Sequence, residues 1–369
     1  MPGNRLLLAF FYTAGVIATA ILVVTKNEGL MLAATEGMYD GGDLYRFAKV
    51  LHFKTDLPAA QPEEEDLTVV DPDTAAVIII GDSFLESCRG HRPFPAMLSE
   101  ALGRPVRPVY AGYAMEFFDP VYFCSRHRLD PGRPRVVVLE RVERYVIPTY
   151  GARRDTAEAA YEETAGESTE TGWTLMRRRW FTDAGRNHEV FLTSSALTWP
   201  LVELWNTFRF MTLGQISEET PVYSLDPPFL FEREETEPGL VTSFTYPKPD
   251  SLVDAVARVI GEMGSVLRSR YNAELVFMPV PGSYTLYHRF VTPEAYDRFL
   301  PRLCRAVERK GVRTIPLYEV FRASPDPVYL PTDTHWNARG AGLALAEAVR
   351  VIRTVRRGVA PTSGKETSR

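Results

Sequence analysis

Short apolar runs alternate with longer amphipathic stretches over most of the chain. The runs are VIII (77–80), VRPVY (106–110), RVVVLE (135–140), ELVFMPV (274–280) and RTIPLY (313–318). Buried parallel strands have this apolar, largely β-branched character. Helical patterns separate or follow the runs at 94–103, 252–271, 293–311 and 338–357. The alternation predicts an α/β fold, a flavodoxin-like three-layer α/β/α domain with a parallel five-stranded sheet.

The N-terminal segment has a different pattern. Residues 6–24, LLLAFFYTAGVIATAILVV, carry no charge, and about 20 apolar residues are enough for a helix to span roughly 30 Å of hydrocarbon. We therefore predict an N-terminal transmembrane helix within residues 1–26, with the rest of the chain outside the cytoplasm. A cleaved signal peptide is the alternative, because Ala18-Thr19-Ala20 has the A-x-A form.

Four further segments follow from the pattern. Residues 27–75 form a lead-in whose second half is rich in proline and acidic residues, which is typical of a linker. Residues 76–356 hold the strand and helix patterns, interrupted at 147–250 by a stretch rich in tryptophan, arginine and acids. We predict that this stretch is an inserted helical subdomain or a lid over the carboxyl edge of the sheet. The polar tail, 357–369, is predicted to be disordered.

Composition excludes some classes of function. The net charge of −5 and the pI near 5.8 argue against a nucleic-acid binder, which normally presents a basic face. Cys88, Cys124 and Cys304 lack metal-ligand spacing, so we predict no metal and no cofactor. One disulfide with a free thiol, or three buried thiols, are both open.

Candidate chemistry follows the first two apolar runs. Gly81 permits a tight turn, and Ser83 begins the next helix, where backbone N–H groups converge. Ser83 is either a helix cap or a nucleophile, and Asp82 is a competing cap. Gly112, after the second run, lets backbone approach a ligand. Its N–H and that of Ser83 are candidates for an oxyanion hole, although Gly112 also fits an ordinary turn.

Polar and aromatic residues follow the third and fourth runs. The third run ends in a charged cluster whose members must pair or face a cleft. A structural ion pair explains Glu143 and Arg144 as well as a substrate site does. Tyrosine and histidine follow the fourth run and are predicted either to line a pocket or to pack. The residues concerned are Glu140, Arg141, Glu143, Arg144 and Tyr145 in the first group and Tyr284, Tyr287 and His288 in the second.

The stretch PTDTHWN (331–337) follows the fifth run. Its histidine, His335, lies 252 positions after Ser83, yet the carboxyl ends of parallel strands meet at one edge of the sheet. We therefore predict a Ser-His-Asp triad for acyl transfer. Ser83 is the nucleophile, His335 its base, and Asp333 orients the imidazole and stabilises the imidazolium.

These motifs resemble the SGNH/GDSL hydrolase superfamily. DTHWN, VERYV (142–146), FMPVPGSYTLY (277–287) and GGDLYRF (41–47) are similar to motifs of the alginate O-acetyltransferase group within it, the AlgJ/AlgX type. The resemblance implies an SGNH fold, catalysis by the triad and the oxyanion position for Gly112. It also implies that Arg144 and Tyr145 lie near the substrate. We further predict substrate contacts for Asp82, Tyr284 and Trp336.

The chain departs from this group in two respects. Ser283 and Tyr284 stand where the group has a lysine, and the serine motif precedes the Asp/His motif, whereas the alginate enzymes have the reverse order. The G-x-N-D motif of the wider superfamily is also missing, as it is in the alginate group.

The leading prediction is a membrane-anchored O-acetyltransferase that acts on an exported or cell-surface polysaccharide. It is expected as a single-pass protein of the cytoplasmic membrane, with its catalytic domain in the periplasm. The resemblance implies a membrane-bound O-acyltransferase partner that supplies acyl groups. An exported esterase with the same triad and a non-catalytic scaffold of a polysaccharide secretion machine are the alternatives.

Overall fold

The computed structural model describes residues 3–26, 30, 41–58, 70–86, 89–110, 118–151, 191, 195 and 198–359. The chain divides into two compact units, one made of 1–56 with 156–220 and the other of 57–155 with 221–369. The division falls within the predicted insertion, 147–250: residues 198–220 group with the first unit and residues 221–250 with the second.

A five-stranded sheet, parallel throughout, forms the centre of the second unit. Its order is β2-β1-β3-β6-β7, the flavodoxin-like order. The strands are β1 Val77–Gly81, β2 Val106–Tyr110, β3 Arg135–Val142, β6 Ala273–Val280 and β7 Arg313–Thr314. The prediction of a five-stranded parallel sheet is confirmed.

The fifth strand is shorter than predicted. β7 ends at Thr314, and α15 Leu317–Arg322 occupies the second half of the predicted strand. Pro316 lies directly before this helix. Proline has no N–H for a strand ladder but is well tolerated where a helix begins, which explains the change.

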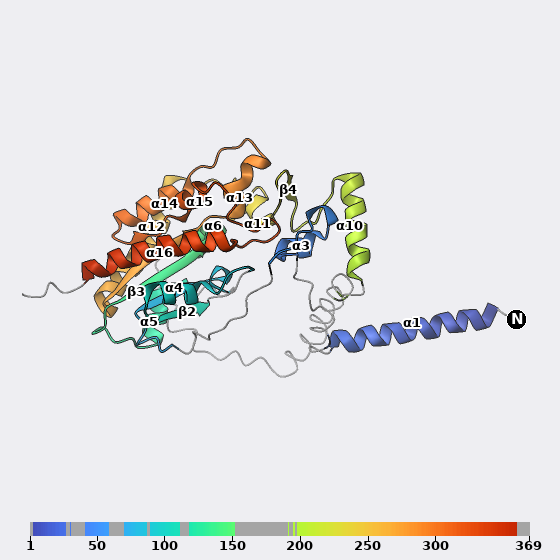
Figure 1. The fold of residues 1–369 in the computed structure, drawn as a ribbon, viewed down its shortest axis with the longest axis horizontal. Helices are drawn as coiled ribbons and strands as arrows, with labels where there is room; N and C mark the ends of the chain where they lie inside the picture. The colour runs from blue at the N-terminus through green and yellow to red at the C-terminus, as the bar shows by residue number, and fades with distance from the viewer. Residues whose placement is uncertain are drawn as a thin grey trace, which may run out of the picture. The chain divides into compact units, whose positions relative to one another are not determined.

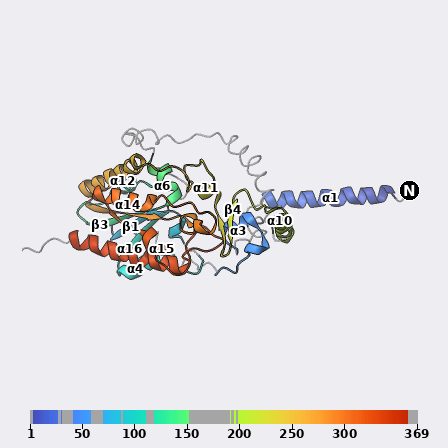
Figure 2. The same cartoon turned by 90° about the horizontal axis from the view of Figure 1, so that it is seen from above.

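Helices cover both faces of the sheet (Figures 1 and 2). On one face lie α12 Asp250–Tyr271 and α14 Phe299–Arg309, and on the other α4 Phe94–Leu102 and α16 Ala338–Val359. Alternate strand residues serve the two cores, with Ile78 and Ile80 in one and Val77 and Ile79 in the other. The three-layer arrangement is thus as predicted, because each strand buries both of its faces.

Shorter elements complete the second unit. They are η3 Ser83–Leu85, α5 Pro120–Arg126, α6 Glu143–Tyr150, the antiparallel hairpin of β4 Val222–Leu225 and β5 Pro228–Phe231, α11 Arg233–Thr236, α13 Ser283–Tyr287 and η6 His288–Phe290. Cys124 and Cys304 are buried free thiols, and burial raises the pKa of each to about 12. Cys88 lies outside the described residues.

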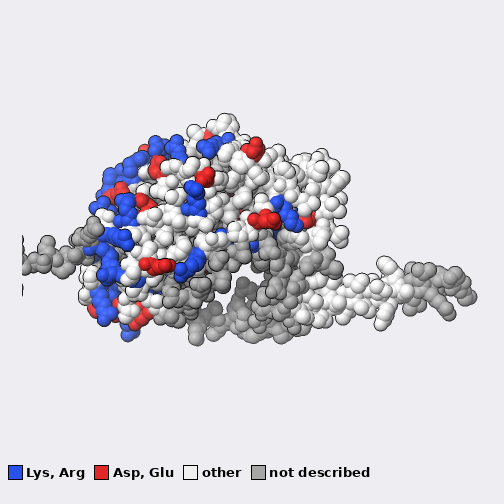
Figure 3. Space-filling model, viewed as in Figure 1, with Lys and Arg blue, Asp and Glu red and all other residues white. Residues whose placement is uncertain are grey.

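Basic side chains gather at the end of the second unit where the strands begin (Figure 3). Arg268 and Arg270 occupy the last turn of α12, and Arg309 the last turn of α14. Cations are favourable near helix C-termini, where the helix dipole is negative. The basic end is therefore a consequence of helices that run antiparallel to the strands, and it lies opposite the carboxyl edge.

The first unit contains α1 Gly3–Lys26, α3 Asp43–Ala48, η1 Leu51–Phe53 and α10 Trp199–Leu213. Glu203 of α10 accepts a hydrogen bond from the Tyr45 hydroxyl and pairs with Lys54 at 3.0 Å. Residues 3–26 of the predicted anchor form the helix α1. Within the described ranges, however, no helix reaches the length and apolarity needed to cross a membrane, so the predicted transmembrane helix is not found.

Candidate active site

Ser83 lies at the junction between β1 and η3. The Asp82 carboxylate accepts a hydrogen bond from the Phe84 N–H at 3.2 Å and so caps this short helix. Of the two predicted helix caps, Asp82 is the one that caps η3. The Ser83 hydroxyl contacts His335 instead. Ser83 is exposed to solvent, which a nucleophile requires.

Gly81 serves this junction in a way the sequence did not reveal. Its backbone is not in the left-handed region. A Cβ at this position would lie 2.3 Å from Oε2 of Glu140 on the neighbouring strand β3 and 2.8 Å from Leu85. Glycine is therefore needed for close packing against Glu140 rather than for the tight turn we expected.

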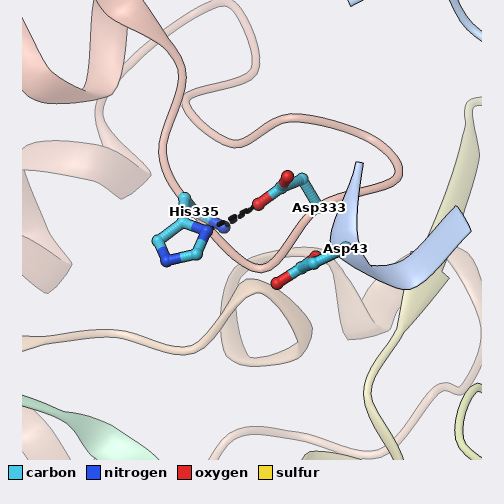
Figure 4. Close-up of side chains that lie close together, drawn as sticks. All are labelled: Asp43, Asp333 and His335. Carbon is cyan, nitrogen blue, oxygen red and sulfur yellow. Dashed lines mark hydrogen bonds and ion pairs between the residues drawn. The ribbon is translucent and has the colours of Figure 1, made fainter. Parts of the chain in front are cut away.

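His335 and Asp333 meet Ser83 across the carboxyl edge of the sheet. The Ser83 Oγ lies 2.7 Å from His335 Nε2, and His335 Nδ1 lies 2.6 Å from Asp333 Oδ1. Figure 4 shows the Asp333 carboxyl directed at the imidazole ring. The same carboxylate oxygen also accepts the backbone N–H of His335 at 3.0 Å. The structure thus brings together all three residues of the predicted triad.

The loop that carries His335 is held by the residues directly after it. Trp336 is fully buried, with its ring centroid 5.0 Å from that of Phe84 and 5.5 Å from that of Phe94. The next residue, Asn337, caps α16 by accepting the Gly340 N–H at 3.0 Å. A Cβ on Gly340 would lie 2.3 Å from the Val328 carbonyl oxygen, so glycine is required there.

This geometry suits general-base catalysis by His335. A neutral His335 with its proton on Nδ1 donates to Asp333 and accepts the Ser83 hydroxyl proton at Nε2. Asp333 is 7% exposed, which strengthens its attraction for the imidazolium that forms when the serine proton is taken. The Ser83 side chain remains open to a reactant.

Arg144 and Tyr145, by contrast, are engaged by the chain itself. Arg144 pairs with Glu235 at 2.9 Å and with Glu232 at 3.2 Å, while the Tyr145 hydroxyl donates to Glu234. Burial is the largest influence on Tyr145 and raises its pKa above the ordinary value. Arg144 thus takes part in a structural ion pair, but its partners are Glu235 and Glu232, whereas Glu143 accepts hydrogen bonds from Gly282 and Tyr296.

The other residues predicted to contact the substrate are buried, hydrogen-bonded within the fold or outside the described residues. Trp336 is fully buried and has no exposed surface. Tyr284 is 7% exposed and packs on Phe231, with ring centroids 5.0 Å apart. Asp82 is occupied by the η3 cap and by Arg141 at 3.5 Å. Gly112 lies outside the described residues.

Two residues next to the triad, Phe84 and Glu140, were not among the predicted site residues. The Phe84 ring centroid lies 5.1 Å from that of His335 and supports the imidazole from one side. Its only sequence signal is its place directly after the candidate nucleophile. Glu140 was one member of a charged cluster, but it is fully buried beneath the Ser83 turn. Among the described residues of the second unit, no three histidine, cysteine or acidic side chains group closely enough to hold a metal ion.

One comparison with known proteins gives a match, and it covers part of the second unit. No curated protein and no solved structure matches the chain. A family model matches residues 230–368, a segment that includes Asp333 and His335 but not Ser83. The resemblance predicted from the sequence is confirmed over this segment. Residues 230–368 are similar to the SGNH hydrolase-like domain of the family described as acetyltransferase AlgX.

Proposed function

We propose that this chain is an SGNH-type O-acetyltransferase that uses Ser83 as its nucleophile. The observation that carries the proposal is the unbroken chain of contacts from Ser83 Oγ to His335 Nε2, at 2.7 Å, and from His335 Nδ1 to Asp333, at 2.6 Å. An acetyltransferase-type activity is supported independently by the family match over residues 230–368.

Acylation of Ser83 is the first half of the proposed reaction. The Ser83 oxygen attacks the carbonyl carbon of an acetyl donor while His335 Nε2 takes the hydroxyl proton. In this proposal, the Ser83 backbone N–H at the start of η3 stabilises the developing oxyanion. The bond to the leaving group then breaks, His335 returns the proton to that group, and an acetyl-serine remains.

Transfer to the acceptor reverses these roles. An acceptor hydroxyl loses its proton to His335 Nε2 and attacks the acetyl-serine carbonyl. Collapse of the second tetrahedral intermediate releases Ser83, which regains its proton from the imidazolium. Asp333 stabilises the imidazolium in both halves, so the same pair of hydrogen bonds serves twice.

The acceptor class follows from the family resemblance rather than from a bound molecule. We propose a hydroxyl of an exported or cell-surface polysaccharide, with a membrane-bound O-acyltransferase as the source of acetyl groups. On this proposal the reaction takes place outside the cytoplasm, where such a polymer is found.

One observation favours an esterase as the second candidate. Ser83 is exposed, so water can reach an acetyl-serine. In an esterase, water takes the place of the sugar hydroxyl and free acetate is released. The two functions share the triad and differ only in the second acceptor.

The test follows the fate of the acetyl group in the full-length chain. The protein is incubated with p-nitrophenyl acetate, with and without an acetyl-accepting oligosaccharide, beside the variant Ser83→Ala. We expect nitrophenol release, acetylated sugar by mass spectrometry, and loss of both in Ser83→Ala. Trapping of acetyl on Ser83 by rapid acid quench identifies the intermediate directly.

Other outcomes separate the alternatives. Nitrophenol and acetate without acetylated sugar indicate the esterase. Release at the same rate in the wild type and in Ser83→Ala contradicts a nucleophilic Ser83 and favours the non-catalytic scaffold. Asp326→Asn is a suitable control, because Asp326 forms an exposed ion pair with Arg339 and touches no triad residue.

A further inference from the structure

Glu140 lies directly beneath the turn that carries Ser83. It belongs to β3, and because Ile80 pairs with Leu139, Glu140 is the next residue along, beside Gly81 at the end of β1. Its side chain is fully buried, and Oε2 accepts the Asp82 N–H at 2.8 Å. That amide is the last one before the candidate nucleophile.

Strands β1 and β3 pack closely at Gly81 and Glu140. A Cβ at Gly81 would come within 2.3 Å of Glu140 Oε2, so the Glu140 side chain in this position requires glycine at 81. The other oxygen, Oε1, is buried and has no hydrogen-bond partner among the residues described. A buried polar atom without a partner lowers stability.

The charges around Glu140 act on the same turn. Asp82 lies on one side, with Arg141 3.5 Å from its carboxylate. The Arg141 guanidinium is fixed in turn, 3.7 Å above the Phe118 ring and bonded to the Thr149 hydroxyl. Arg141 therefore holds the Asp82 side chain, and Glu140 holds its backbone. Burial first, and then the Asp82 charge, raise the pKa of Glu140 well above its ordinary value.

We propose that Glu140 is a positioning residue for the reaction. By accepting the Asp82 amide, it fixes the backbone from which the Ser83 hydroxyl meets His335. The inference rests on the proposed role of Ser83 as nucleophile. Displacing a reacting group by about 1 Å can cost about 10²-fold in rate, which sets the scale of the effect.

Two substitutions at this position separate shape from hydrogen bonding. Glu140→Gln keeps an acceptor oxygen and nearly the same volume, whereas Glu140→Leu keeps much of the volume and removes the acceptor. We expect Glu140→Leu to lower the rate constant of Ser83 acetylation by p-nitrophenyl acetate about 10- to 100-fold, with KM little changed. Glu140→Gln should stay within about threefold of the wild type.

Glu143 offers a matched control on the next helix. It is also a buried glutamate that accepts a backbone N–H, but from Gly282 at 3.2 Å, together with the Tyr296 hydroxyl at 2.7 Å. Glu143→Leu should lower the melting temperature as Glu140→Leu does. Its acetylation rate per folded molecule should stay near that of the wild type.

A second readout does not depend on activity. Hydrogen exchange of the Asp82 amide, followed by mass spectrometry, should become faster in Glu140→Leu and remain slow in Glu140→Gln and Glu143→Leu. Wild-type acetylation in Glu140→Leu, or an Asp82 amide that stays protected, overturns the positioning role. If Ser83→Ala proves as active as the wild type, the proposed function fails, and amide exchange alone then decides whether Glu140 holds the turn.

Discussion

Two polar clusters occupy the carboxyl edge of the same sheet, and they differ in how their hydrogen-bonding capacity is used. In the triad, Ser83 is exposed and its oxygen lies 2.7 Å from Nε2 of His335. In the second cluster, the Arg144 side chain is only 10% exposed and faces the carboxylates of Glu232 and Glu235. Both clusters contain residues of motifs that resemble the family, but of the two residues compared, the Ser83 side chain is exposed and that of Arg144 is largely buried.

The difference teaches how to distinguish reactive from structural polar groups. Charges at the end of a buried strand must either pair within the fold or face a ligand. Arg144 pairs with three acids that lie about 90 positions later in the chain, between Glu232 and Glu235. In the triad, His335 contacts the acid Asp333 through Nδ1 and the hydroxyl of Ser83 through Nε2.

The largest expected effect comes from breaking the first cluster at its acid. Asp333→Asn should lower the rate of Ser83 acetylation about 10⁴-fold, because an amide no longer favours the imidazole proton on Nδ1 and cannot stabilise the imidazolium. Stopped-flow nitrophenol release measures this. Glu234→Gln, in the second cluster, is the contrast and should stay within about threefold of the wild type. Equal losses in the two variants contradict the division between the clusters.

The second expected effect is on stability and comes from breaking the other cluster. Arg144→Met leaves Glu235 and Glu232 without their cation in a largely buried site and should destabilise the second unit by about 3–5 kcal/mol. Arg298→Met removes an exposed pair with Glu319 and should cost at most about 1 kcal/mol. Denaturant unfolding compares the two variants.

Activity per folded molecule completes that test. Arg144→Met should acetylate Ser83 at close to the wild-type rate once the folded fraction is taken into account. A stable variant with a KM raised tenfold or more indicates instead that Arg144 contacts the substrate, as the motif resemblance implied.

The sheet was predictable from sequence because buried parallel strands leave a clear mark. Four of the five apolar runs end within about two residues of the observed strands. The position of His335 beside Ser83 also followed, since parallel strands bring their carboxyl ends together. Only Pro316, which ends β7 early, altered this part of the prediction.

The orientation of single rings and the pairing of distant charges were not predictable. Nothing in PTDTHWN distinguishes a tryptophan that faces a substrate from one that packs on Phe84 and Phe94, because both use an apolar ring beside a histidine. Likewise, the acids that neutralise Arg144 lie in a segment we assigned to an insertion. Local patterns carry no information on such long-range contacts.

Trp336 gives a third and smaller test, which separates packing from substrate binding. Trp336→Phe leaves part of its buried volume empty and should cost about 1–2 kcal/mol, less than the full loss of an aromatic ring. The KM for p-nitrophenyl acetate should change by less than about twofold. Unchanged stability with a strongly raised KM contradicts the core position and supports the substrate contact.

The smallest effect is a pH dependence that belongs to Glu140. Its folded-state pKa is raised above the ordinary 4.5 by burial and by Asp82, with Arg141 acting in the opposite direction. The folded chain therefore holds this proton more tightly than the unfolded chain. The stability that results is fully present below about pH 4.5 and is lost as the pH rises through the folded-state pKa.

Glu140→Gln cannot titrate at this position, so comparison of the two proteins isolates the contribution of Glu140. The stability of the wild type relative to Glu140→Gln should be greatest at acid pH, decline as the pH rises and then level off. Thermal unfolding across this range measures it, with the exposed Glu100→Gln as the control. A constant difference between wild type and Glu140→Gln means that the carboxyl titrates alike in both states. In that case the burial of Glu140 beneath Ser83 has no effect on the pH dependence of stability.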